Sequence, residues 1–160
     1  MDFWEKLAHK AAYHFLHPLL RLYRVLFSPA RDSARVLLTY GNEVMLVRNI
    51  GVRRWALPGG AIDNGETPKV CALRELKEEL NIADAEIEYK LGTYDGEFHG
   101  KKVLVHVYIA RAKSLYHKKQ WEIDRSGWFA LNQLPPNLSS ATARRIGEYK
   151  NGLRSVSAVW

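Results

Sequence analysis

The sequence contains very little cysteine and no long hydrophobic run, and both absences exclude whole classes of protein. Cys71 is the single cysteine among 160 residues, so an internal disulfide framework and a cysteine-rich zinc site are excluded. No apolar run approaches the roughly 18 residues that a membrane-spanning helix needs. The chain also begins without the basic, apolar and small-residue succession of a secretory signal. We therefore expect a cytoplasmic protein.

The composition that remains is that of one globular domain. Hydrophobic residues make up 47% of the chain and charged residues 26%, which excludes wholesale disorder and a multi-pass membrane protein. The net charge is +7, but residues 1–31 and 140–160 each carry +3, and the 108 residues between them only +1. Such flanks suit an anionic substrate, a nucleic acid or an anionic membrane surface. Net charge does not choose among these, so it makes no strong case for nucleic acid.

Residues 1–30 have a pattern of their own. From Phe3 to Leu20 apolar residues come in pairs four residues apart, which indicates helical amphipathicity. Pro18 is tolerated only in a first helical turn, so we expect two helices, at about 2–16 and 18–27. We thus divide the chain into an amphipathic extension, residues 1–30, and a domain, residues 31–160. Two roles are open for residues 1–27. They would lie on an anionic membrane surface, which would make the protein peripheral to a membrane, or they would pack against the domain or a second subunit of a homodimer.

The rest of the chain predicts strands before and after a central helix. The expected elements are a hairpin at 35–40 and 44–48, a helix at 68–80, strands at 86–97, 102–112 and 127–130, and a last helix from about 140 to 149. Hairpin connections combined with a central helix indicate a mixed sheet, and hence an α/β domain with α+β character.

The helix at 68–80 carries three carboxylates on one side. On a helical wheel with Glu75 at 0°, Glu79 lies at about 40° and Glu78 at about −60°. An apolar set falls on the opposite side, which we expect to face the core: Val70, Leu73, Leu76 and Leu80. Thr67 is the expected N-cap and Asn81 the left-handed C-cap.

Three like charges on one helix face need an explanation, because they repel one another. Hard divalent cations such as Mg²⁺ prefer carboxylate oxygens, so a metal site is one explanation. A solvated acidic face is the other, and the spacing alone favours it.

A longer motif decides between them. The stretch Gly60-x5-Glu66-x7-Arg74-Glu75-Leu76-Lys77-Glu78-Glu79-Leu80-Asn81-Ile82 resembles the Nudix box, G-x5-E-x7-R-E-U-x-E-E-x-G-U, in which U is aliphatic. Every specified position matches except the last glycine, which is Asn81 here. The resemblance covers about residues 33–150, so residues 31–160 are interpreted as a Nudix hydrolase domain.

The resemblance implies a Nudix fold, an α/β/α sandwich around a mixed sheet. It also implies hydrolysis, with Mg²⁺ or Mn²⁺, of a pyrophosphate bond in a nucleoside diphosphate linked to another group. Carried over by position, the metal ligands would be Glu75, Glu78, Glu79 and the carbonyl of Gly60. The catalytic set would be Glu75, Glu78, Arg74 and Glu66, with Arg74 orienting the carboxylates and Glu66 pairing with Arg74.

Several residues and functions stay open at this stage. The general base is Glu75 or a glutamate outside the box, with Glu97 and Glu122 as candidates. Side chains that could contact a nucleotide, each also explained by ordinary packing or solvation, are Arg48, Arg53, Arg54, Tyr94, Phe98 and Trp121. His106 is better explained as a strand residue than as a metal ligand, because no second histidine stands at a ligand spacing. The alternatives to a small-molecule hydrolase are a non-catalytic nucleotide-binding regulator with the same fold and an RNA 5′-end pyrophosphohydrolase.

Overall fold

Seven strands and two helices make up the part of the chain that the structure describes. The structure is a computed structural model and describes residues 30–98, 100–120 and 123–160. The elements are β1 (Ser33–Tyr40), β2 (Glu43–Asn49), β3 (Gly59–Ala61), α2 (Pro68–Leu80), β4 (Glu86–Phe98), β5 (Lys101–Arg111), β6 (Ile123–Ala130), α3 (Ser140–Lys150) and β7 (Val156–Val159). In these residues no helix is both long and apolar enough to cross a membrane. The helices expected within residues 2–27, with their membrane or dimer contacts, lie outside the described residues, as do Trp121 and Glu122.

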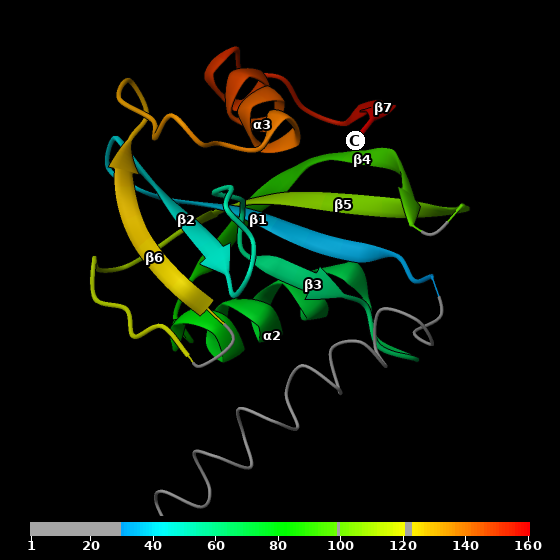
Figure 1. The fold of residues 1–160 in the computed structure, drawn as a ribbon, viewed down its shortest axis with the longest axis horizontal. Coiled ribbons are helices and arrows are strands. Elements are labelled where there is room, and N and C mark those ends of the chain that lie inside the picture. Colours follow the sequence, from blue (N-terminus) through cyan, green and yellow to red (C-terminus); the bar gives the residue numbers. More distant parts are fainter. Residues whose placement is uncertain (1–29, 99, 121–122) are drawn as a thin grey trace, which may run out of the picture. The chain divides into compact units, whose positions relative to one another are not determined.

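The strands form one mixed sheet in the order β6-β2-β1-β5-β4-β7, with β3 paired to β1 beside this path. β1 runs parallel to β5 and β4 parallel to β7, whereas the other pairs are antiparallel. Helix α2 covers one face of the sheet and α3 the other (Figure 1). Each helix closes its own hydrophobic core against the sheet. The α/β class and the mixed-sheet sandwich are confirmed.

Both predicted hairpins are present, and two short strands are additional. β1 and β2 join at the turn containing Gly41, and β4 and β5 join around Gly100. Both glycines have a positive φ, 57° and 74°, which a residue with a Cβ adopts only at a cost. The sequence did not predict β3, which has three residues, or β7, which has four.

Helix α2 begins and ends where its capping residues predict. The Thr67 side chain accepts a hydrogen bond from the Val70 amide, and Pro68 occupies the first turn. Asn81 follows the last turn with φ 57° and ψ 31°, and its amide donates to carbonyls of the preceding turn. The residue that departs from the Nudix box therefore takes the left-handed conformation that glycine usually supplies.

Asn81→Gly is expected to raise the free energy of unfolding by at most about 1 kcal/mol, because glycine enters this conformation without a Cβ clash. Hydrolytic activity should not change, since the substitution alters a helix end and removes no carboxylate. Thermal unfolding of the two proteins checks this. A lower melting temperature for Asn81→Gly would show that the asparagine side chain stabilises the helix end by a contact of its own.

The prediction of which side of α2 faces the core was wrong in part. Val70 is 54% exposed and Leu73 36%, whereas Cys71 and Ala72 are fully buried and Glu79 is 7% exposed. The buried side is therefore rotated toward the carboxylates. The small side chains of Cys71 and Ala72 let the helix lie close to β1 and β3, and the Glu79 carboxylate is stabilised there by a hydrogen bond from the Gly59 amide.

Candidate functional site

The acidic residues of the motif gather around one arginine. Arg74 Nε and Nη2 donate to the two carboxylate oxygens of Glu66, each over 2.9 Å. Its third nitrogen, Nη1, donates to Glu75 over 2.9 Å and to Glu78 over 2.8 Å. This forked geometry uses the planar guanidinium fully and fixes three carboxylates relative to one another. The ion pair expected between Glu66 and Arg74 is present.

The surroundings of the carboxylates shift their proton affinities in opposite directions. The hydrogen bonds from Arg74 lower the pKa of Glu66 from 4.5 to about 2. Burial raises the pKa of Glu75, and the charge of Arg74 opposes that rise. Glu66 is therefore a permanent anion that holds the arginine, while Glu75 is a carboxylate kept partly away from water.

The strand β3 brings the backbone against these carboxylates. A Cβ added to Gly60 would lie 2.7 Å from Cδ of Glu75, so only glycine leaves room for this carboxylate beside the strand. The preceding amide, that of Gly59, donates to Glu79 Oε2 over 2.9 Å. Glu79 thus lies against Gly59 and Glu75 against Gly60, the glycine whose carbonyl is a predicted metal ligand.

Side chains from two other elements hold the carbonyls of β3. Arg35 of β1 donates to the carbonyl of Gly59. Arg74 donates to the carbonyl of Ala61 over 3.1 Å, and the Cys71 thiol lies 3.8 Å from the carbonyl of Gly60 and 3.5 Å from that of Ala61. Burial raises the pKa of the Cys71 thiol to about 11, so it stays protonated and donates.

The segment that leads into β3 is fastened by the region around the start of α3. The Trp55 amide donates to the Asn137 carbonyl over 2.8 Å, and the Ser139 amide donates to the Trp55 carbonyl over 2.9 Å. Two residues later, the Leu57 amide donates to Oγ1 of Thr142 over 3.3 Å. Residues 137–142 therefore fix the path of the chain just before the two glycines.

The donor set suits a hard divalent cation. Carboxylate oxygens and a backbone carbonyl are the ligands that Mg²⁺ and Mn²⁺ prefer. As they stand, however, no three His, Cys, Asp or Glu side chains in the described ranges are grouped closely enough to hold a metal ion. In place of a cation, Nη1 of Arg74 lies between the carboxylates of Glu75 and Glu78 and supplies the positive charge between them. These two side chains would have to turn from Arg74 toward a cation.

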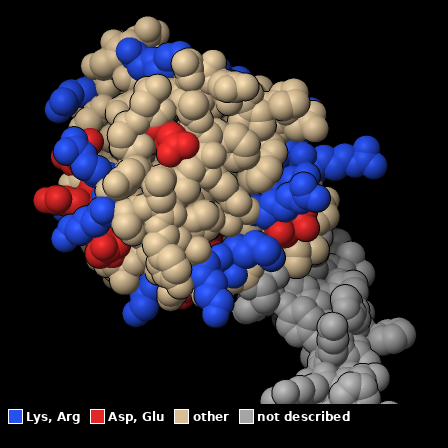
Figure 2. Space-filling model, turned by 90° about the vertical axis from the view of Figure 1, so that its left-hand side faces the viewer, with Lys and Arg blue, Asp and Glu red and all other residues tan. Residues whose placement is uncertain are grey.

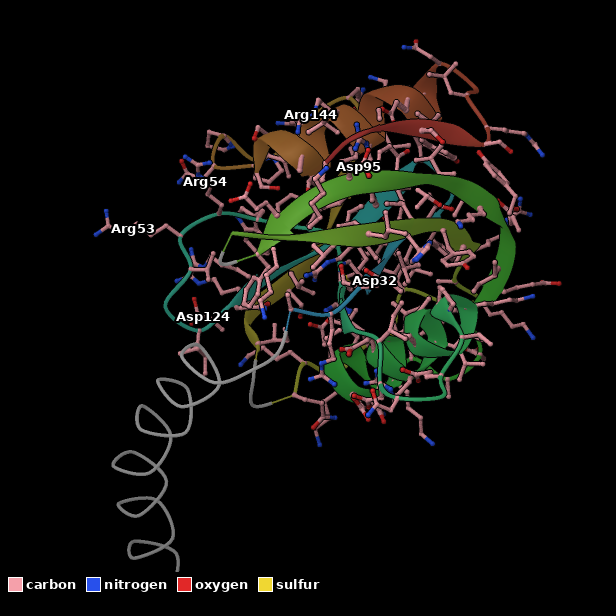
Figure 3. All side chains as sticks on the ribbon, turned by 90° about the vertical axis from the view of Figure 1, so that its right-hand side faces the viewer. Asp32, Arg53, Arg54, Asp95, Asp124 and Arg144 are labelled. Carbon is pink, nitrogen blue, oxygen red and sulfur yellow. The ribbon has the colours of Figure 1, made fainter. Side chains whose placement is uncertain are left out.

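The other candidate residues are placed less favourably or serve other contacts. Arg48 pairs with Asp124 and lies 5.7 Å from the centre of the Trp55 ring. Arg53 and Arg54 are exposed on the loop between β2 and β3, and Arg53 extends away from the body of the molecule (Figure 3). Arg48 thus belongs to a surface ion pair, and Arg53 and Arg54 are solvated loop residues.

Among the remaining candidates, Glu97 is exposed near the end of β4, and Phe98 is 42% exposed beside it. Tyr94 is buried and donates to Glu148, which excludes it as an open stacking surface. His106 is half-buried on β5, next to the hydroxyl of Thr93, as an ordinary strand residue. The identity of the general base stays a prediction.

Sequence reasoning missed Arg35 and Gly59. Both contact the carboxylate site through β3, a strand too short to show a periodicity. One signal was present, since Arg35 is the single charged residue of its strand and is followed by an apolar run, where a charged side chain requires a partner.

The chain is similar to known proteins in sequence and in fold. The model of the NUDIX domain matches residues 29–149. The oxidized purine nucleoside triphosphate hydrolase of Mus musculus is 35% identical over 112 residues, which are 68% of this chain and 71% of the mouse protein. The NAD-capped RNA hydrolase NudC of Pseudomonas aeruginosa (strain LESB58) is 31% identical over 109 residues, which are 65% of this chain but only 37% of that enzyme.

Among solved structures, the MutT NUDIX hydrolase from Burkholderia pseudomallei superimposes with a TM-score of 0.62. It is 27% identical, and the match covers 74% of this chain and 96% of that protein. The sequence match and the structural match thus coincide on the domain that contains the carboxylate helix.

Proposed function

The chain belongs to the NUDIX family and is a pyrophosphohydrolase of that family, and on this premise we propose that it cleaves, with a divalent cation, a pyrophosphate bond in a nucleoside diphosphate linked to another group. The observation that carries the proposal is the placement of Glu75 and Glu79 against the two glycines of β3, with Arg74 and Glu66 ordering the cluster.

Each residue of the cluster has a role in this proposal. Glu75, Glu78, Glu79 and the carbonyl of Gly60 would hold Mg²⁺ or Mn²⁺, a cation that makes water a stronger nucleophile at neutral pH and offsets charge on phosphoryl oxygens. Arg74 and Glu66 would keep the carboxylates in register. Glu75 is the candidate inside the cluster for accepting a proton from the attacking water, because its carboxylate lies beside Gly60 and burial raises its pKa above the usual range of a glutamate.

The names of the relatives narrow the substrates worth testing. An oxidised purine nucleoside triphosphate and an NAD cap on RNA share one feature, a purine nucleotide with a phosphoanhydride bond. The small-molecule substrate is the stronger proposal, because the chain spans only 37% of the RNA hydrolase. On the face shown in Figure 2, Lys and Arg lie mostly around the rim of a largely tan area that contains an acidic side chain, and they form no continuous stripe for a nucleic-acid backbone there.

The test is a substrate panel with Mg²⁺ or Mn²⁺. It should contain 8-oxo-dGTP, dGTP, ADP-ribose, a dinucleoside tetraphosphate and an NAD-capped RNA oligonucleotide. We expect hydrolysis of at least one small nucleotide, abolished by EDTA and restored by excess Mg²⁺. The melting temperature should not change with EDTA, since the helix packs on the sheet through its own core residues.

Binding of a nucleotide without turnover under any condition would instead identify a non-catalytic regulator, and turnover of the capped RNA alone would identify an RNA 5′-end hydrolase.

A further inference from the structure

Arg35 is a charged residue in a strand whose neighbouring residues belong to the hydrophobic core. It lies in β1 between Ala34 and Val36, both fully buried, and is itself only partly exposed. Its guanidinium donates to the carbonyl of Gly59, the residue paired with it in the sheet. This contact gives the partly buried guanidinium a hydrogen-bond acceptor, which a charged group removed from water needs.

Gly59 connects Arg35 to the carboxylate helix. Its carbonyl accepts from Arg35, and its amide donates to Glu79 Oε2 over 2.9 Å. Its φ of 132° is a conformation that favours glycine, and an added Cβ would lie 2.9 Å from Cα of Arg35. A glycine is also the residue with the most backbone freedom, so both of its peptide planes need external partners to stay in place.

We infer that Arg35 is a positioning residue for the hydrolytic site, acting on Glu79 and on the Gly60 carbonyl through Gly59. Holding the carbonyl of Gly59 fixes the peptide plane shared with Gly60, and holding Gly59 as a whole fixes the amide that orients Glu79. The inference rests on the proposed metal-dependent function. It adds a residue outside the box, on a different strand, to the groups that set the geometry of the box.

If Arg35 acted only through its charge, its removal would change the cation affinity in the opposite direction. The positive charge of Arg35 acts on Glu75, so by charge alone it repels a divalent cation, and its removal would tighten cation binding. A positioning role predicts that removal weakens binding, because groups that orient metal ligands typically change metal affinity by about 10- to 100-fold. The direction of the change therefore separates the two roles.

The experiment compares Arg35→Met and Arg35→Lys with the wild-type protein. Arg111→Met is the matched control, since Arg111 is an exposed strand arginine whose partner is Glu88. The first measurement is Mn²⁺ affinity by electron paramagnetic resonance. The second is hydrogen exchange of the Gly59 amide by NMR in metal-free protein, which does not depend on the proposed function.

We expect Arg35→Met to bind Mn²⁺ about tenfold more weakly and its Gly59 amide to exchange at least about tenfold faster. Arg35→Lys, which keeps the charge but not the planar fork, should lie between Arg35→Met and wild type in both measurements, and Arg111→Met should equal wild type. If Arg35→Met does not fold, Arg35→Lys carries the test. Unchanged or tighter Mn²⁺ binding, or unchanged Gly59 exchange, in a folded Arg35 variant overturns the inference while leaving the proposed function intact. A wild-type protein that binds no Mn²⁺ overturns both.

Discussion

Glu79→Gln is expected to leave the fold intact and to lower kcat by about two orders of magnitude or more. Glu79 is 7% exposed, and its carboxylate accepts a hydrogen bond from the Gly59 amide. The carbonyl oxygen of glutamine accepts the same bond, so packing and backbone geometry are preserved. The negative charge is lost, and with it the electrostatic part of cation binding. Steady-state kinetics on the best substrate of the panel, beside a thermal melt, measures both effects.

A matched control removes a charge elsewhere. Glu86→Gln changes an exposed glutamate at the start of β4 and should keep wild-type turnover and stability. A folded Glu79→Gln protein with near wild-type kcat would refute the assignment of Glu79 as a metal ligand. The same burial that makes this residue sensitive also predicts that Glu79→Ala destabilises the protein, because the Gly59 amide would lose its acceptor.

Gly60→Ala is expected to reduce kcat about 100-fold with little change in melting temperature. The added methyl group would meet the carboxylate of Glu75, the flexible end of a side chain, which can move aside without disturbing the backbone. Moving it displaces a predicted ligand by about 1 Å, a misplacement that can cost two orders of magnitude in rate. The effect should appear as lost turnover and weaker Mn²⁺ binding.

Alanine substitutions at two other glycines serve as comparisons for Gly60→Ala, one expected to be neutral and one expected to destabilise the fold. Gly127→Ala places a methyl group 3.4 Å from the Phe129 ring, an ordinary contact, and should be neutral. Gly59→Ala should lower the free energy of unfolding by at least about 3 kcal/mol, because the methyl group meets the β1 backbone and φ is positive. Wild-type kcat in Gly60→Ala would mean that Glu75 has no fixed position in catalysis.

The sequence predicted the elements of the fold well where the signals are local. Helix α2 begins after Thr67 and is capped by Asn81, as capping chemistry requires, and β5 alternates between buried and more exposed residues over 103–107 before a buried run at 107–110. The short strand β7 could not be predicted, because its four residues are mostly exposed and are ordered by parallel pairing with β4, more than 60 residues earlier in the chain.

The sequence indicated which charged residues lie near one another but not how they are arranged, and their roles in catalysis stay predictions. A helical wheel gives only the angle of each residue, so the apolar side containing Val70 was expected to face the core and Glu79 was placed on the opposite side of α2. The structure reverses these two because the Gly59 amide gives Glu79 a buried partner. Such a partner lies 20 residues away in the chain and belongs to a strand defined only by its pairing with β1. The contribution of Arg35 is hidden for the same reason.

The hydrogen bonds from residues 137–142 to Trp55 and Leu57 have a consequence for biosynthesis. The ribosome makes the chain from its amino end, so all four glutamates of the box are synthesised at least 63 residues before Thr142, which accepts a hydrogen bond from Leu57. A nascent chain that ends before residue 137 has every carboxylate, but the segment before β3 is held only by its backbone bonds to β1 and β2 and lacks those to residues 137–142. We therefore expect the site to reach its final geometry only after α3 packs on the sheet, and a chain truncated before residue 137 to hydrolyse substrate poorly.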